Sequence, residues 1–335
     1  MDIAPLRRLT SFQIIILLFA AVILAGALLL MLPFASQSGR VTPFDETLFT
    51  ATSAVCVTGL VVQDTATYWS YFGQAVILLL IQIGGLGVVT VASAIALLAG
   101  RRISLMQRGT MQEAISAPKV GGIVRLTGFI LRAVFLIEGI GAACLAPVFV
   151  RDFGLRGIWM AVFHSISAFC NAGFDLMGVR APYSSLVAYA GNPVVSLTIA
   201  GLIVVGGIGF LTWEDIRTNG LHLHAYRLQS KVILFMTAIL IFLPALFFFF
   251  VDFADMPLHE RVLAALFQAV TPRTAGFNTV DLTCMTDVSK GLITGLMLIG
   301  GAPGSTAGGM KVTTFVVIAL SVLVYAAVTR KSGWY

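Results

Sequence analysis

The sequence predicts an all-α integral membrane protein built from repeated helix–pore loop–helix modules. Three observations predict this fold class. First, the chain of 335 residues is 58% hydrophobic and only 11% charged, whereas soluble domains carry about 25% charged residues. Second, long apolar segments alternate with short ones, and each short segment ends at a glycine in similar surroundings. Third, a Gly/Pro-rich stretch interrupts the last long apolar segment.

The composition also excludes several classes of function. The sequence pI is about 9.4, but the basic residues gather in particular loops, as membrane topology requires. We therefore expect no nucleic-acid partner. The four cysteines show no CxxC spacing and the four histidines form no zinc motif, so neither a disulfide framework nor a metal site is expected. A membrane-embedded enzyme would need a convergent nucleophile, base or metal cluster, which the sequence does not supply.

Six apolar segments are long enough to cross a bilayer core, which takes about 20 residues. Arg7 and Arg8 precede the first of them, which is longer than the apolar part of a signal peptide, about 7–15 residues. We therefore expect a first transmembrane helix with a cytoplasmic N-terminus. The predicted spans are 12–34, 71–99, 126–150, 190–213, 232–251 and 288–328.

A shorter apolar segment lies between the two spans of each pair. Segments of this length suit re-entrant half-spans, which enter the membrane and turn back. Acidic residues such as Asp64 and Asp175 occur around the half-spans, whereas basic residues such as Arg101 and Arg227 gather in the linkers between pairs. By the positive-inside rule the linkers are cytoplasmic and the half-spans enter from outside. The predicted half-spans are 44–57, 157–171 and 261–274.

The half-spans are internal repeats with a period of roughly 100 residues, which indicates stacked modules around an axis. The sequences SAVCVTGL, SAFCNAGFDL and AVTPRTAGFNTVDL carry the repeated glycines Gly59, Gly173 and Gly276. The predicted modules are 1–100, 126–213 and 231–330, and the cytoplasmic linkers are 101–125 and 214–230.

The repeated glycines predict a selectivity filter at a central cation pore. Non-helical backbone at membrane depth is tolerated only where it is buried or lines a water-filled path. Glycine permits positive φ, and rings of backbone carbonyls can replace the hydration shell of a monovalent cation. The alternative is close helix packing, but three glycines in register favour the filter. The predicted ion-binding residues are Val57, Thr58, Gly59, Asn171, Ala172, Gly173, Thr274, Ala275 and Gly276.

The last apolar segment, 288–328, predicts a broken helix that carries an intramembrane gating loop. As one helix it would measure about 60 Å, twice the bilayer core. A loop on the cytoplasmic side of the third filter segment could obstruct the pathway; the alternative is a passive kink. A lysine at this depth is either functional or snorkels to the inner interface. The predicted gate is the loop 300–311, with Gly300, Gly301, Pro303, Gly304, Ser305, Thr306, Gly308, Gly309 and Lys311.

Two further features lie near the predicted pathway: two glycine clusters and one arginine. The glycine clusters at 84–87 and 206–209 lie within predicted spans, and we interpret them as close helix packing. Arg273 precedes the third filter segment, where a cation must be held away from the pore axis. We expect it to lie against Asp281 or against helix-end carbonyls.

These residues resemble a known family. VTGL, NAGFDLMG, TPRTAGFNTVDL and GGAPGSTAGGMKVTTF look like the pore subunits of the Trk/Ktr/HKT superfamily of potassium transporters, and the resemblance covers essentially the whole chain. A start directly at the first module is more like the Ktr branch. The resemblance implies K+ uptake across the bacterial cytoplasmic (inner) membrane, often Na+-dependent, without an organic cofactor. It also implies a homodimer resting on a cytosolic nucleotide-binding regulatory ring.

The sequence departs from that family in one respect, because the family has four modules and this chain shows three. Three quarters of a ring would leave filter backbone facing lipid, which the bilayer penalises. The expectation is therefore a truncated product, and the alternative is a second chain that supplies the fourth module. A different functional class also stays open, in which the chain is a non-conducting remnant or an accessory membrane subunit.

Overall fold

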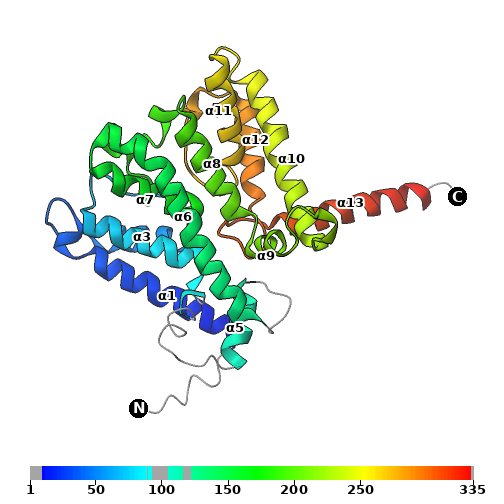
Figure 1. Ribbon diagram of the computed structural model, residues 1–335, viewed down its shortest axis with the longest axis horizontal. Coiled ribbons are helices and arrows are strands. Elements are labelled where there is room, and N and C mark those ends of the chain that lie inside the picture. The colour runs from blue at the N-terminus through cyan, green and yellow to red at the C-terminus, as the bar shows by residue number, and fades with distance from the viewer. Residues whose placement is uncertain (1–9, 89, 93–104, 116–121, 333–335) are drawn as a thin grey trace.

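The computed structural model describes residues 10–88, 90–92, 105–115 and 122–332, and every regular element in these ranges is a helix. The predicted all-α class is therefore confirmed (Figure 1). Arg7, Arg8 and Arg101 lie outside the described residues. The helices are α1 (Ser11–Leu30), α2 (Phe44–Val55), α3 (Tyr71–Leu86), α5 (Leu105–Ile115), α6 (Ile123–Phe153), α7 (Arg156–Phe169), α8 (Pro193–Gly207), α9 (Phe210–Asn219), α10 (Leu228–Val251), α11 (Leu258–Val270), α12 (Asp287–Leu298) and α13 (Val312–Ser332).

The first helix of each module is a long apolar span. Among the described residues, α1, α6 and α10 are single helices long and apolar enough to cross a membrane. They correspond to the predicted spans 12–34, 126–150 and 232–251. Because their outward side chains are apolar and their backbone groups are bonded within the helix, lipid can surround them without unsatisfied polar groups.

The second helix of each module is broken. Helix α3 ends at Leu86 and is followed by Gly87 at φ 83°. Helices α8 and α9 meet at 95° across Gly209, which has φ 88°. The predicted span 190–213 is therefore bent at Gly209 and is not one continuous helix, and the last part of 71–99 lies outside the described residues. Apolar content cannot reveal such a break, since glycine adopts positive φ without a side-chain penalty.

The predicted half-spans are the short helices α2, α7 and α11. Proline precedes two of them, because Pro43 and Pro257 occupy the N-cap positions, where a missing N–H costs nothing. Acidic residues lie in the first turn of both, where they complement the positive end of the helix dipole. Each helix ends shortly before its repeated glycine, so its partly negative C-terminus lies at the loop that follows.

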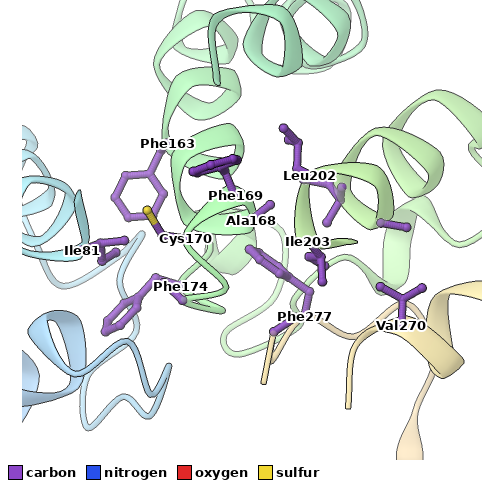
Figure 2. Close-up of a cluster of buried hydrophobic side chains, with 14 of the residues drawn as sticks. Ile81, Phe163, Ala168, Phe169, Cys170, Phe174, Leu202, Ile203, Val270 and Phe277 are labelled. Atoms are coloured by element: carbon purple, nitrogen blue, oxygen red, sulfur yellow. The ribbon is translucent and has the colours of Figure 1, made fainter. Parts of the chain in front are cut away.

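The second module lies between the first and the third. Figure 2 shows one buried cluster that contains Ile81 of α3, Phe169 and Cys170 of the second half-span, Val270 of the third half-span and Phe277 of the loop after it. All five side chains are nearly or fully buried. This packing brings segments far apart in the sequence together and fixes the three loops after the half-spans against one another. Helix α13 points away from this body in Figure 1.

Candidate functional site

The three loops that follow the half-spans share one backbone conformation. In each, the repeated glycine and the residue two positions before it have positive φ. Non-glycine residues with positive φ are uncommon, and β-branched ones are outliers that persist only where the surroundings impose them. The repeats therefore share a local backbone conformation that the β-branched Val57 and Thr274 do not favour. The φ values are 56° and 77° at Val57 and Gly59, 57° and 72° at Asn171 and Gly173, and 67° and 82° at Thr274 and Gly276.

The three glycines also bring neighbouring loops into direct backbone contact. A Cβ atom on Gly59 would lie 2.4 Å from the carbonyl oxygen of Ala172, and one on Gly173 would lie 2.7 Å from that of Ala275. A Cβ atom on Gly276 would lie 3.2 Å from the Cα atom of Gly173. Glycine is thus required for space as well as for positive φ. Sequence reasoning identified only the second requirement.

Hydroxyl groups in and just after the half-spans donate hydrogen bonds that stabilise the loops. Ser167 donates a hydrogen bond of 2.7 Å to the carbonyl of Phe174, and Thr271 donates to the carbonyl of Phe277. Thr58 donates to the hydroxyl of Ser53 at 2.9 Å. These bonds stabilise the turn just past the glycine in the second and third loops. Sequence reasoning missed Ser53, Ser167 and Thr271, whose recurring hydroxyls near the half-span ends were the available signal.

The predicted gate is an intramembrane loop that closes on itself between α12 and α13. The amide of Gly300 donates to the carbonyl of Met310 at 2.9 Å, and the amide of Val312 donates to that of Gly301 at 3.0 Å. A Cβ atom on Gly300 would lie 1.9 Å from the carbonyl oxygen of Gly308. The two ends of the loop therefore lie side by side, and the polar residues between them form its tip.

The intramembrane loop docks on the break between α8 and α9. The amide of Ala302 donates to the carbonyl of Gly207 at 2.8 Å, and the amide of Thr306 donates to that of Gly206 at 3.3 Å. In return the amide of Phe210, in the first turn of α9, donates to the carbonyl of Gly304 at 2.8 Å. A broken helix exposes unpaired backbone donors and acceptors. Here the intramembrane loop provides hydrogen-bond partners for both the donors and the acceptors at the break.

The remaining polar side chains near the loop are held locally. Lys311 donates from Nζ to the carbonyl of Ala307 at 2.7 Å, which keeps the ammonium group beside the loop. Arg273 is 7% exposed and its guanidinium donates to Thr237 at 3.5 Å. Of the two contacts expected for Arg273, the one with Asp281 is not formed, since Arg273 bonds to Thr237. The carboxylate of Asp281 accepts hydrogen bonds from the hydroxyl and amide of Thr283. These bonds lower the pKa of Asp281.

Arg273 instead faces the region between the intramembrane loop and α8. With Gly207, Gly301 and Ala307 it lines a cavity of about 10 Å³, which is room for about one water molecule. The predicted site residues thus lie together in one place. The filter segments adjoin through their backbones, and the loop 300–311 lies against the second and third of them.

Comparison with known proteins shows which family the chain resembles. Residues 2–331 match the TrkH family, described as "Cation transport protein". The chain is 41% identical over 314 residues to "Potassium/sodium uptake protein NtpJ" of Enterococcus hirae, covering 92% of this chain and 68% of that protein. It is 39% identical over 325 residues to "Ktr system potassium uptake protein B" of Bacillus subtilis, covering 95% of this chain and 71% of that protein.

The fold is also similar to a solved structure. The crystal structure of the potassium transporter TrkH from Vibrio parahaemolyticus superposes with a TM-score of 0.69 at 19% sequence identity. The match covers 95% of this chain and 62% of the other. The predicted fold of helix–pore loop–helix modules is confirmed by this likeness. The chain spans roughly two thirds of the length of the proteins it matches.

Proposed function

Since the chain belongs to the TrkH family of cation transport proteins, we propose that it forms a pathway for K+ uptake across the bacterial cytoplasmic membrane. The family consists of transport proteins, so an enzymatic function is set aside. The apolar spans α1, α6 and α10 place the chain in a membrane. The division into modules 1–100, 126–213 and 231–330, joined by linkers 101–125 and 214–230, is part of the proposal.

The observation that carries this proposal is the shared conformation of the three loops. In each, positive φ recurs at the glycine and two residues before it, and the carbonyl oxygens of Ala172 and Ala275 lie against the glycine of the preceding module. Carbonyl oxygens gathered in this way can replace the water around a dehydrated K+ ion. The filter would comprise Gly59, Gly173 and Gly276 with the two residues before each. The C-termini of α2, α7 and α11 add negative potential at the same place.

The intramembrane loop 300–311 is proposed as the gate. It is not helical, it lies within a membrane-spanning module, and its polar groups are bonded to the second and third modules. A loop in this position would have to move for an ion to pass. A passive kink would need no such set of bonds to another module.

Sodium dependence is a separate part of the proposal. One relative is named a potassium/sodium uptake protein, and carbonyl filters can pass either ion depending on fine geometry. Uptake of Rb+ measured with and without external Na+ tests this part. Faster uptake in Na+ would support coupling, and identical rates would remove Na+ from the proposal.

The partners and the orientation are also proposed. Relatives named as parts of a "Ktr system" support a multi-component assembly, here a homodimer on a cytosolic nucleotide-binding ring. A cytoplasmic N-terminus is supported by basic residues around the connection between α9 and α10, because cytoplasmic segments are enriched in Arg and Lys. These residues are Arg217, Arg227 and Lys231. Labelling of single cysteines from each side of the membrane tests the orientation.

The decisive test is Rb+ uptake in bacterial cells that lack their own potassium uptake systems. Gly276→Asp should reduce uptake to the level of empty vector, because it puts a bulky charged side chain into the filter. Gly39→Asp is the matched control, since Gly39 also has positive φ (67°) but no atom within 4 Å of an added Cβ. Equal uptake by the parent chain and Gly276→Asp would overturn the filter. A parent chain that reaches the membrane without uptake would favour a non-conducting subunit.

A further inference from the structure

Two filter residues contact the intramembrane loop through their side chains. The amide nitrogen Nδ2 of Asn171 donates a hydrogen bond of 2.8 Å to the hydroxyl of Thr306. The hydroxyl of Thr274 accepts a hydrogen bond of 3.1 Å from the backbone amide of Gly308. Thr306 and Gly308 both belong to the intramembrane loop. Bonds therefore connect the second and third filter segments directly to the proposed gate.

The bond at Asn171 has a defined direction. The hydroxyl of Thr306 has one hydrogen, and it donates this to the carbonyl of Phe169 at 2.9 Å. The same oxygen can then only accept from Asn171, so Asn171 must present its NH2 group. Asn171 is 1% exposed and Thr306 is 6% exposed. Water therefore cannot readily replace the bond, and a buried donor left without a partner is costly.

The first module provides an internal comparison. Val57, Asn171 and Thr274 occupy the same position, two residues before the repeated glycine, and all three have positive φ. Only Asn171 and Thr274 carry side chains that can form hydrogen bonds. The backbone conformation therefore does not depend on these polar groups. The hydrogen bonds of Asn171 and Thr274 to the loop are therefore available for another role.

We infer that Asn171 and Thr274 are positioning residues that hold the intramembrane loop against the filter, so that opening the pathway requires breaking both hydrogen bonds. This inference rests on the proposed function and assigns a second role to two filter residues. Their backbones belong to the filter, and their side chains set the position of the gate. Weakening either bond should favour the open position of the loop.

The first experiment measures Rb+ uptake for Thr274→Val, Asn171→Val and the double variant. Thr274→Val keeps the shape and removes the hydroxyl, and Val57 shows that valine occupies this position at φ 56°. Each single variant should increase the maximal uptake rate by up to about fivefold, equivalent to about 1 kcal/mol for one hydrogen bond. Thr274→Ser keeps the hydroxyl and should return the rate towards that of the parent.

A matched control removes a hydroxyl elsewhere in the same module. Thr294 of α12 donates within its own helix to the carbonyl of Lys290 and is exposed. Thr294→Val should therefore leave the uptake rate at the parental value. A merely structural role for Thr274 predicts lower uptake in Thr274→Val, so the direction of the change separates a structural role from an anchoring one.

The second experiment follows the loop itself and does not depend on transport. Gly308→Cys is introduced after replacing the exposed cysteines Cys56, Cys144 and Cys284 with serine. An added Cβ at Gly308 meets only the Cγ2 atom of Thr274, at 3.9 Å. In membranes, a small maleimide should label this cysteine several times faster when Asn171→Val is also present, and Thr294→Val should not change the rate.

The outcomes separate this inference from the proposed function. If Gly276→Asp abolishes uptake while neither Thr274→Val nor Asn171→Val changes the uptake rate and Asn171→Val leaves the labelling rate unchanged, the filter stands and the anchoring role is wrong. Reduced uptake with unchanged labelling also overturns the anchoring role. Faster labelling supports it even if the parent chain conducts no ion.

Discussion

The second and third modules break their second helices at similar glycine clusters but in different ways. In the second module only Ile208 and Gly209 separate α8 from α9, and the chain turns by 95°. In the third module the loop 299–311 separates α12 from α13. One break is a tight corner, and the other is a loop that leaves its own module and docks on that corner.

The contacts around the two breaks bear on the proposal that the second module is the scaffold for a moving loop of the third. The indole of Trp213 in α9 donates to the carbonyl of Val205 in α8 at 3.0 Å, across the corner. Asp215 accepts hydrogen bonds from the hydroxyl of Ser230 at 2.6 Å and the amide of Arg227 at 3.1 Å, which ties α9 to α10. The intramembrane loop, in contrast, is joined to the second module by hydrogen bonds of its residues 302–306 and is continuous with α12 and α13 of its own module.

The largest expected effect on stability follows from adding a side-chain atom where two backbone segments approach closely, beside the α8–α9 corner. A Cβ atom on Gly206 would lie 2.0 Å from the carbonyl oxygen of Phe169 and 2.7 Å from the hydroxyl of Thr306. Gly206→Ala should therefore destabilise the protein by about 3 kcal/mol, the upper part of the range for overpacking. Gly207→Ala is the control, because its Cβ would meet only the Cβ of Ala307, at 3.9 Å.

The measurement is the thermal unfolding midpoint of the detergent-solubilised protein, followed by tryptophan fluorescence. A clear decrease is expected for Gly206→Ala and a much smaller one for Gly207→Ala. Equal midpoints for the two variants would show that the corner can relax. The second module would then not be the rigid partner in the comparison.

The comparison also shows how far the sequence determines this structure. The half-spans were predictable, since apolar segments too short to cross a bilayer, each ending at a repeated glycine, are typical of re-entrant structure. The loop 300–311 was predictable because 288–328 is too long for one span. The breaks at Gly87 and Gly209 were not, because packing glycines and hinge glycines look alike in a sequence. The contact of Arg273 with Thr237 was also hidden, since it depends on where α10 lies.

A smaller effect on stability is expected at the hydrogen bonds of Asp215, which join α9 to α10. Asp215 is 4% exposed and accepts from Ser230 and Arg227 through one carboxylate oxygen. Asp215→Asn keeps the shape but weakens these bonds and the 3.5 Å ion pair with Arg227. A loss of about 1–2 kcal/mol is expected for impaired bonds to a buried group. If α9 is the support of the gate, Rb+ uptake in this variant should also change, whereas unchanged stability and uptake would contradict that role.

The smallest effect on stability is expected at the neighbouring residue, Glu214. Its carboxylate lies 2.6 Å from the guanidinium of Arg227, but both side chains are more than one third exposed, at 36% and 43%. Exposed ion pairs contribute little because water and salt screen them, so Glu214→Gln should cost about 0.5 kcal/mol or less. This small difference should shrink further when unfolding is measured at high salt. A loss as large as that of Asp215→Asn would mean that α9 is held mainly by its surface charges, and the stability of the α8–α9 corner would then fall as ionic strength rises.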